Sequence, residues 1–224
     1  YVPTRRMNTY QVWWRFDAEQ LDRQIGYATR IHLNALRMWL SPERWWEAPD
    51  EVQRNLDTLL AIADRHGIKI LLSLFKNCGA DPTMKVPVDL LDESPVTGYE
   101  VHSPSREILN DEKRWGPCFD YVDWFMARYR DDTRLLAIEI MNEPGLHDVD
   151  TETRFALAML KRAREQKGAL RLTMGCIGLK DNRRFIGQGL DVMQSHPNFL
   201  KSVEQFDSFQ REQAALRRDT GLPY

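Results

Sequence analysis

Short apolar segments of strand length alternate with amphipathic helical segments along most of this chain. The clearest apolar segment, residues 68–75, is almost continuously hydrophobic, which is typical of a strand covered on both faces. Comparable strands are expected at residues 33–40, 135–141, 170–175 and 190–195. Buried strands that alternate with helices indicate a parallel α/β sheet joined by right-handed crossovers.

Helices are expected between these strands because apolar residues recur there at helical spacing. Asp17, with Gln20 three residues later, predicts the start of the first helix. Asp50 predicts the start of the second, and Gly67 its end. Further helices are expected over residues 121–129, over 151–167 with Thr151 as the cap, and over 203–220.

A closed barrel and an open, doubly wound sheet both fit this alternation. An open-sheet nucleotide binder carries a glycine-rich turn directly after its first strand. The glycines of residues 175–178 and 187–189 lack the full spacing of that motif and are typical of ordinary turns. The sequence therefore favours the barrel, with residues 1–224 as a single domain.

Composition excludes several classes of function. The net charge is -2, from 31 basic and 33 acidic residues, so the sequence predicts no nucleic-acid partner. No run approaches the ~18 apolar residues that a membrane span requires, so no membrane partner is expected. The three cysteines fit neither a disulfide framework nor a zinc motif and are expected to be small buried hydrophobes, with a Cys78–Cys118 bridge as the alternative.

One segment, residues 76–117, is long, lacks periodicity and is rich in Asp, Pro, Ser and Gly. A connection of this length in a compact domain is usually functional or disordered. It follows the strand that ends at Phe75, so we expect a long loop on the carboxyl-end face of the sheet. In a barrel this is the active-site face.

The most specific local signal is the end of the strand at residues 138–144, where Asn142, Glu143 and Pro144 follow an apolar run. Pro144 predicts an extended conformation for Glu143. A partly desolvated carboxyl at this place is expected to have a raised pKa and to donate a proton near neutral pH. Asn142 could hydrogen-bond a sugar hydroxyl beside the reacting carbon. The alternative is a strand that simply ends in polar turn residues.

Two other polar residues stand out in apolar surroundings. Arg37 lies inside an expected strand, where an unpaired guanidinium is very unfavourable, so it requires a carboxylate partner. That partner is either part of a structural ion pair or a catalytic carboxylate that Arg37 orients. His196 directly follows the strand at residues 190–195 and precedes Pro197, and it is either structural or part of a site.

Several tryptophans lie outside helical core spacing, where aromatic faces could stack on sugar rings. The alternative for each is packing, and Trp39, close to Arg37, is the one expected to face a sugar. The group comprises Trp13, Trp14, Trp39, Trp45, Trp46 and Trp115.

The acidic and histidine side chains of residues 147–152 lack a fixed ligand spacing, and a solvated loop before a capped helix explains them better than a metal site. No metal and no other cofactor is expected.

Residues 33–37, 138–144 and 191–197 together resemble the retaining glycoside hydrolases of clan A, with the cellulases and mannanases of glycoside hydrolase family 5 as the closest type. Residues 8–13 and 101–104 also look like loops of these relatives. The resemblance implies a (β/α)8 TIM barrel in which Glu143 is the general acid/base. It further implies that Asn142 contacts the 2-hydroxyl of the substrate, that Arg37 supports the nucleophile and that His196 lines the site.

This chain departs from the clan A pattern in one respect, the nucleophile. Retaining hydrolysis needs a second carboxylate, which in clan A is a Glu that ends the seventh strand. Counted against such a barrel, the chain runs from the end of strand 1, at residues 1–3, to the start of strand 7, at residues 221–224. We therefore expect an incomplete barrel, a nucleophile beyond Tyr224 and no turnover by these 224 residues alone.

The expected function is hydrolysis of O-glycosidic bonds in a β-linked oligo- or polysaccharide by a retaining double displacement. The alternative is a carbohydrate-binding barrel without turnover. In either case the expected partner is a carbohydrate, bound by a monomeric protein.

Overall fold

The computed structural model describes residues 9–79, 101–198 and 200–224. Its centre is a four-stranded sheet in the order β1-β2-β3-β4, in which every neighbouring pair is parallel. The strands are β1 (Ala35–Trp39), β2 (Lys69–Lys76), β3 (Leu135–Asn142) and β4 (Leu172–Gly175). The predicted parallel α/β architecture is confirmed. The described strands form an open sheet that does not close on itself.

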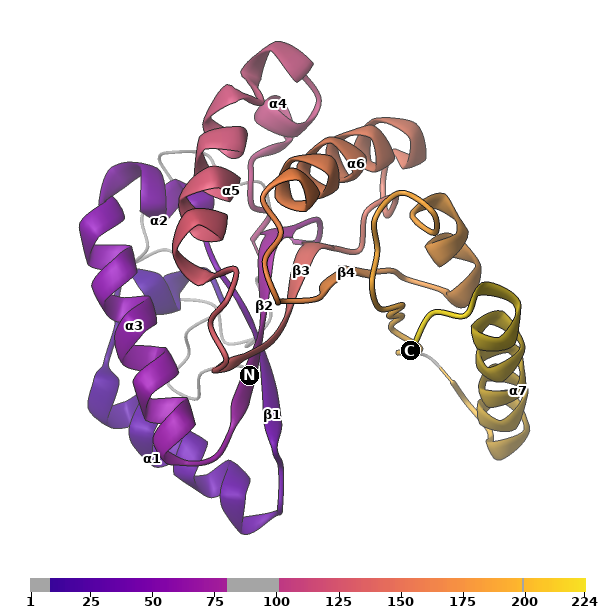
Figure 1. Cartoon of the computed structure of the whole chain (residues 1–224), viewed down its shortest axis with the longest axis horizontal. Coiled ribbons are helices and arrows are strands. Elements are labelled where there is room, and N and C mark those ends of the chain that lie inside the picture. The colour runs from indigo at the N-terminus through magenta and orange to yellow at the C-terminus, as the bar shows by residue number, and fades with distance from the viewer. Residues whose placement is uncertain (1–8, 80–100, 199) are drawn as a thin grey trace.

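Helices cover the outer face of this sheet (Figure 1). The longer ones are α1 (Ala18–Arg30), α3 (Pro49–Arg65), α5 (Gly116–Tyr129) and α6 (Val149–Glu165). Shorter ones are η1 (Gln11–Trp13), α2 (Pro42–Glu47), α4 (Arg106–Leu109), η3 (Glu112–Arg114) and η4 (Leu179–Arg184). The helix α7 (Val203–Thr220) lies to the side of the sheet and packs on η4. The helix α1 packs on α3, and α5 packs on α6, so the helices follow one another around the strands.

The hydrophobic core lies between these helices and the sheet. The apolar stripe of α3, which includes Leu56, Leu59 and Leu60, is fully buried. On the next part of the sheet, Phe75 of β2 meets Phe155 of α6 edge to face at 5.2 Å. Burial of this many large side chains is the main force that holds helices to strands.

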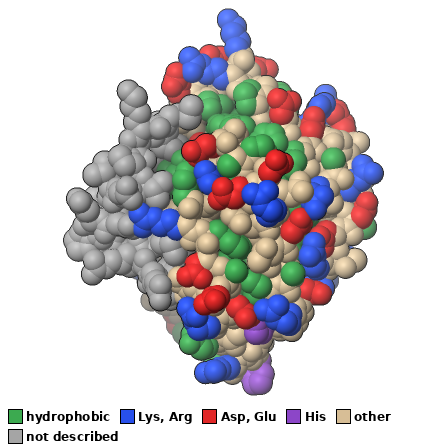
Figure 2. All heavy atoms as spheres, turned by 90° about the vertical axis from the view of Figure 1, so that its left-hand side faces the viewer, with side chains coloured by type: hydrophobic (Ala, Val, Ile, Leu, Met, Phe, Trp, Pro, Cys, Tyr) green, Lys and Arg blue, Asp and Glu red, His purple; other side chains and the backbone are tan. Residues whose placement is uncertain are grey.

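The outer face of the first helices is polar. Figure 2 shows acidic and basic side chains interspersed over the side of the molecule that carries α1, α2 and α3. On the part of the chain that the structure describes, no helix is both long enough and apolar enough to cross a lipid bilayer.

Two of the predicted helix ends are confirmed. The Asp17 side chain accepts a hydrogen bond from the backbone N–H of Gln20 at the start of α1. Gly67 follows α3 with φ +69°, a conformation that glycine adopts without a steric penalty.

Two predicted helix starts were wrong. Pro49 is the first residue of α3, where its fixed φ suits the helix, so Asp50 lies inside the first turn. The helix α6 begins at Val149, because the Asp148 carboxylate accepts from the N–H groups of Asp150 and Thr151. Thr151 is therefore not the cap.

The strand predicted at residues 190–195 is present only as an irregular extension of the sheet. Two isolated parallel bridges, Thr173 to Val192 and Cys176 to Ser195, hold this segment beside β4. The N–H of Met193 in turn donates to the carbonyl of Pro223 at 2.8 Å. The spatial order of the segments therefore follows the predicted order, although the regular ladder stops at β4.

Part of the predicted long loop has structure of its own. At Ser103 the chain returns to the sheet and makes an antiparallel bridge to Lys76 at the end of β2. The short helices α4 and η3 follow before α5. Residues 80–100 of the predicted loop lie outside the described residues.

The cysteines are all free, so the alternative Cys78–Cys118 bridge does not form. Cys118 and Cys176 are buried as predicted, whereas Cys78 is partly exposed at the end of β2. The expectation of three buried cysteines was therefore wrong for Cys78, which lies beside the candidate site described next.

Candidate active site

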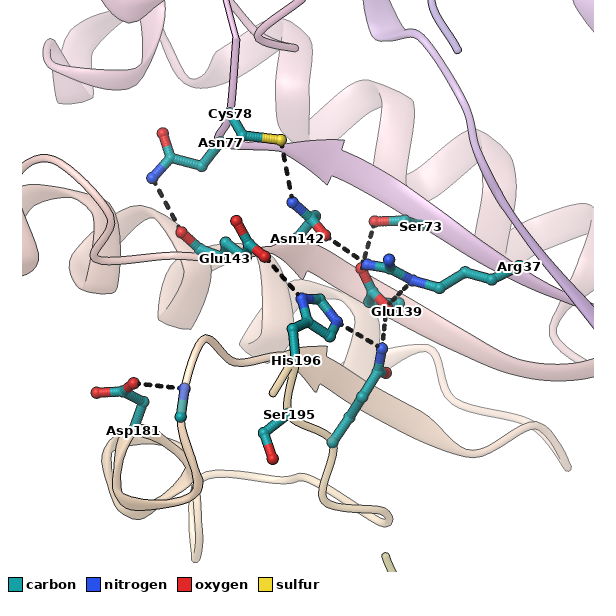
Figure 3. A network of polar contacts seen from close by, with 12 residues as sticks. Arg37, Ser73, Asn77, Cys78, Glu139, Asn142, Glu143, Asp181, Ser195 and His196 are labelled. Atoms are coloured by element: carbon teal, nitrogen blue, oxygen red, sulfur yellow. Dashed lines mark hydrogen bonds and ion pairs between the residues drawn. The ribbon is translucent and has the colours of Figure 1, made fainter. Parts of the chain in front are cut away.

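Four of the five predicted site residues meet at the carboxyl ends of the parallel strands. Arg37 extends from β1, Asn142 ends β3, Glu143 follows it, and His196 follows the irregular segment beside β4 (Figure 3). Because carboxyl ends of parallel strands share one edge of the sheet, residues far apart in sequence converge there.

Arg37 is partly buried and has the carboxylate partner that its place in an apolar strand requires, which is Glu139. The guanidinium donates from Nε to Oε2 at 2.7 Å and from Nη2 to Oε1 at 2.5 Å. Nη2 also donates to Oδ1 of Asn142 at 2.5 Å. Arg37 is thus one half of an ion pair and at the same time orients the amide beside Glu143.

Glu139 is fully buried and surrounded by donors. Besides Arg37, its carboxylate accepts from Ser73 Oγ at 2.7 Å and from Gln194 Nε2 at 2.8 Å. A Cβ on Gly175 would lie 2.8 Å from Oε1 of this carboxylate, closer than side chains tolerate. Glycine at position 175 therefore makes room for the Glu139 side chain.

Glu143 differs from the prediction in its backbone. Its φ is +54°, so the expected extended conformation was wrong. Its N–H donates to the Gly175 carbonyl at 2.6 Å, and its own carbonyl accepts from Asn77 Nδ2 at 3.1 Å. Contacts from both neighbouring strands thus impose a left-handed conformation that is unfavourable for a residue with a side chain, and such residues concentrate at functional sites.

The carboxylate of Glu143 faces His196, whose Nδ1 lies 2.9 Å from Oε1 (Figure 3). Both side chains are mostly buried, with 16% of Glu143 and 12% of His196 exposed. The hydrogen bond from His196 lowers the pKa of Glu143, and the charges of His196, Arg37 and Lys76 act in the same direction against the effect of burial. The raised pKa expected from desolvation was therefore wrong for the described residues.

Asn142 uses both polar atoms of its side chain within the site. Its Oδ1 accepts from Arg37, and its Nδ2 lies 3.4 Å from the sulfur of Cys78. A thiol sulfur is a weak acceptor, so the amide N–H groups remain suited to a stronger acceptor such as a sugar hydroxyl.

Trp39 ends β1 and borders the same cluster. Its ring lies beneath two cations, with the Arg37 guanidinium carbon 4.4 Å and Lys76 Nζ 5.2 Å from the ring centroid. The ring is partly exposed. Stacking of Trp39 on a sugar stays a prediction.

The other tryptophans are chiefly packing residues. Trp13 and Trp115 are buried core residues, so the packing alternative is confirmed for both. Trp14, Trp45 and Trp46 are partly buried and pack against the same core. Their loop positions in the sequence did not reveal this, because short helices such as η1 and α2 fold these segments back over the sheet.

The polar cluster of residues 147–152 serves the local fold. Asp148 caps α6, and the buried Glu152 carboxylate accepts from the N–H groups of Gly145 and His147. Within residues 9–79, 101–198 and 200–224, no group of three or more His, Cys, Asp or Glu side chains is arranged to hold a metal ion.

Sequence reasoning missed four site residues, namely Ser73, Lys76, Gly175 and Gln194. Ser73 and Lys76 are polar residues in an apolar strand, the same signal that identified Arg37. Lys76 is 3% exposed and donates to Thr9 Oγ1 at 3.0 Å. Burial lowers its pKa to about 8. Gln194 lies two residues before His196, the spacing that places side chains on one face of an extended segment.

Comparison with known proteins gives a clear result for the fold. Neither a protein-family model nor a curated protein matches the sequence. Solved structures of glycoside hydrolases do match. The endo-β-1,4-mannanase from Thermotoga petrophila is 13% identical with a TM-score of 0.65, and the match covers 92% of this chain and 56% of that one.

Two structures from Rhizomucor miehei agree with this match. The endo-1,4-β-mannanase is 13% identical with a TM-score of 0.62, and the match covers 95% of this chain and 73% of that one. The family 5 mannosidase is 14% identical with a TM-score of 0.63, at coverages of 90% and 61%. The chain thus spans between 56% and 73% of these three proteins.

The class that follows is a parallel α/β chain with the TIM-barrel fold of glycoside hydrolases. Family 5 enzymes are among the structures that share this fold, so the predicted resemblance is confirmed at the level of the fold.

Proposed function

We propose that this chain forms the catalytic barrel of a glycoside hydrolase that cleaves O-glycosidic bonds in a β-linked oligo- or polysaccharide. The observation that carries the proposal is the hydrogen-bonded pair of Glu143 and His196 beside Asn142, at the carboxyl ends of parallel strands. In barrels of this kind the reacting groups lie at that edge.

In the proposed mechanism Glu143 is the general acid/base. As an acid it protonates the leaving glycosidic oxygen, and as a base it then activates the water that releases the sugar. Asn142, held by Arg37, hydrogen-bonds the 2-hydroxyl next to the reacting carbon. His196 holds the Glu143 carboxylate in position.

The proposal includes a second carboxylate as the nucleophile, about 5–5.5 Å from that of Glu143. Glu139 is unsuited to this role because its side chain is completely buried and Arg37, Ser73 and Gln194 occupy both of its oxygens. Glu93 and Glu100 lie outside the described residues. We keep the expectation that the nucleophile is a Glu that ends a strand following Tyr224.

The positive charges near Glu143 would favour the binding of a second carboxylate group beside it. Arg37, Lys76 and His196 together lower the pKa of Glu143. A nearby nucleophile carboxylate would oppose this effect and raise the pKa of Glu143, since like charges disfavour ionisation. The charges of Arg37 and Lys76 would also favour the ionised form of the nucleophile. Proton donation by Glu143 thus depends on the second acid.

Among β-linked polymers, β-1,4-mannan is the first substrate to test, because several structures of similar fold are endo-1,4-β-mannanases. The second candidate function is a carbohydrate-binding barrel without turnover. The lowered pKa of Glu143 favours this alternative, because an ionised carboxylate cannot donate a proton.

The test is the release of reducing sugar from β-mannan, β-xylan and a soluble cellulose derivative by the native full-length protein. We expect hydrolysis of at least one polymer and a loss of about 10²–10⁴-fold in Glu143→Gln. Glu165→Gln is the control, since that side chain is 53% exposed on α6. Binding of a polymer without any release would establish the alternative.

A parallel assay tests where the nucleophile lies. The chain of residues 1–224 alone is expected to show no turnover. Robust hydrolysis by this chain, lost in Glu143→Gln, would mean that the nucleophile lies within it.

A further inference from the structure

Gln194 connects the two acidic side chains of the site. Its Nε2 lies 2.8 Å from Oε2 of Glu139 and 3.1 Å from Nε2 of His196. His196 in turn contacts Glu143 through Nδ1 at 2.9 Å. A chain of hydrogen bonds therefore runs from the Arg37–Glu139 ion pair to the proposed acid/base.

The orientation of the Gln194 amide follows from its neighbours. The Glu139 carboxylate, paired with Arg37, offers only acceptor atoms, so the amide atom 2.8 Å from it must be the nitrogen. That –NH₂ group has two hydrogens. One is donated to Glu139, and the second is available to His196.

The proton on His196 is then determined as well. Because the Gln194 nitrogen donates, Nε2 of His196 must accept and cannot carry a hydrogen in the neutral ring. The ring proton of the neutral imidazole therefore lies on Nδ1, from which it is donated to Oε1 of Glu143.

We infer that Gln194 is a positioning residue that fixes His196 in the Nδ1–H tautomer and thereby directs the acid proton of Glu143 to Oε2. The second half of this inference rests on the proposed function. With Oε1 occupied by the His196 donor, Oε2 is the oxygen of Glu143 left to carry a proton to a leaving group. The tautomer itself is a property of the folded chain, whatever reaction it catalyses.

Gln194 is held firmly enough for this role. Its N–H donates to Oδ1 of Asn182 at 3.2 Å, and its carbonyl accepts from Nδ2 of the same residue at 3.0 Å. Asn182 is fully buried. The backbone is therefore clamped by one amide while the side chain is held by Glu139, so the –NH₂ group has a defined direction.

The test is a long-range ¹⁵N–¹H spectrum of the histidine rings in the labelled chain, in weakly alkaline buffer. The ring signals that disappear from the spectrum of His196→Phe are those of His196. We expect Nδ1 of His196 at the protonated nitrogen position and Nε2 at the unprotonated one. The reverse pattern in the unsubstituted chain would overturn the inference without any need for a variant at Gln194.

A pair of variants separates Gln194 from Glu143, which also favours a proton on Nδ1. In Glu143→Ala the one remaining hydrogen-bond partner of the His196 ring among the described residues is Gln194, so we expect the Nδ1–H form to persist. In Glu143→Ala with Gln194→Met, which has similar volume but no donor, we expect the Nε2–H form that free imidazole side chains prefer. Adding the exposed Gln188→Met instead is the matched control and should leave the spectrum of Glu143→Ala unchanged.

A shift to Nε2–H in Glu143→Ala alone would overturn the inference, because Glu143 rather than Gln194 would then set the tautomer. Persistence of Nδ1–H in the double variant would overturn it as well. Failure of the sugar-release assay would count against the proposed function only, since the spectrum is recorded without substrate.

Discussion

Arg37 on β1 and Glu139 on β3, 102 residues apart in sequence, form a two-point ion pair inside the sheet wall, with N–O distances of 2.7 and 2.5 Å. The Glu139 side chain is completely buried, and the Arg37 side chain is 23% exposed. This pair holds Asn142 on one side and Gln194 on the other. The arrangement of the candidate site therefore depends on an ion pair that takes no direct part in the proposed chemistry.

Loss of Arg37 is expected to destabilise the fold strongly. Arg37→Met leaves the buried Glu139 carboxylate without its cation, which typically lowers the free energy of unfolding by about 3–5 kcal/mol. Urea denaturation measures the change. In a double-mutant cycle with Glu139→Gln, we expect a coupling of about 1–3 kcal/mol, because the residues are in direct contact.

An exposed pair of the same type is the control. Arg162 and Asp123 are 43% and 31% exposed and lie 2.5 Å apart. Arg162→Met is expected to lower the free energy of unfolding by less than about 1 kcal/mol. Equal losses at Arg37 and Arg162 would show that the buried pair has no special role in stability.

Gly175→Ala is expected to disturb the site from the side of β4. The added Cβ would lie 2.8 Å from Glu139 Oε1 and 3.0 Å from His196 Cε1, so the strand or both side chains must move. We expect a loss of about 1–3 kcal/mol in the free energy of unfolding. Gly116→Ala is the control, because no atom lies within 4 Å of a Cβ there. An unchanged free energy of unfolding in Gly175→Ala would mean that small shifts relieve the close contact.

Lys76 predicts a dependence of stability on pH. Burial lowers its pKa from 10.5 to about 8. Between these two values the unfolded chain binds the proton and the folded chain does not, so this residue makes stability rise with pH. Below about pH 8 the folded state carries the full penalty, about 3 kcal/mol for a shift of this size.

The measurement is the free energy of unfolding of Lys76→Met relative to the unsubstituted chain at pH 7 and pH 10. We expect the free energy of unfolding of the variant, relative to the unsubstituted chain, to be higher at pH 7 than at pH 10 by up to about 3 kcal/mol, because Met removes the penalty. The exposed Lys161→Met serves as the control and should show no such pH-dependent difference. A constant difference for Lys76→Met at both pH values would contradict the assignment.

The sequence predicted the order of the strands and much of the site because both depend on local patterns. A continuous apolar run identified β2, and the single charge inside an apolar run identified Arg37 and its need for a carboxylate. Asn142, Glu143 and His196 stood out because each directly follows a predicted strand. Residues with these signals are brought together in the fold, because the carboxyl ends of parallel strands lie at the same edge of the sheet.

What the sequence could not predict depends on contacts between distant segments. The positive φ of Glu143 is imposed by Asn77 and Gly175, which overcome the preference that Pro144 introduces. The direction of the Glu143 pKa shift depends on which of burial and neighbouring cations dominates, and only the positions of His196, Arg37 and Lys76 decide this. The spacing of Gln194 from His196 places the two side chains on one face, but its contact with Glu139 arises only when β3 packs beside this segment.

The role of Glu143 as the proton donor is the central claim, and its most direct test compares two leaving groups in Glu143→Ala of the native full-length protein. Glycosides of the sugar that the protein hydrolyses are suitable, one with dinitrophenol and one with an unactivated alcohol as the leaving group. A dinitrophenolate leaves without protonation, so we expect kcat/KM to fall by about 10²–10⁴-fold for the unactivated substrate and far less for the activated one. An equal loss with both substrates, or no loss with either, would contradict the account.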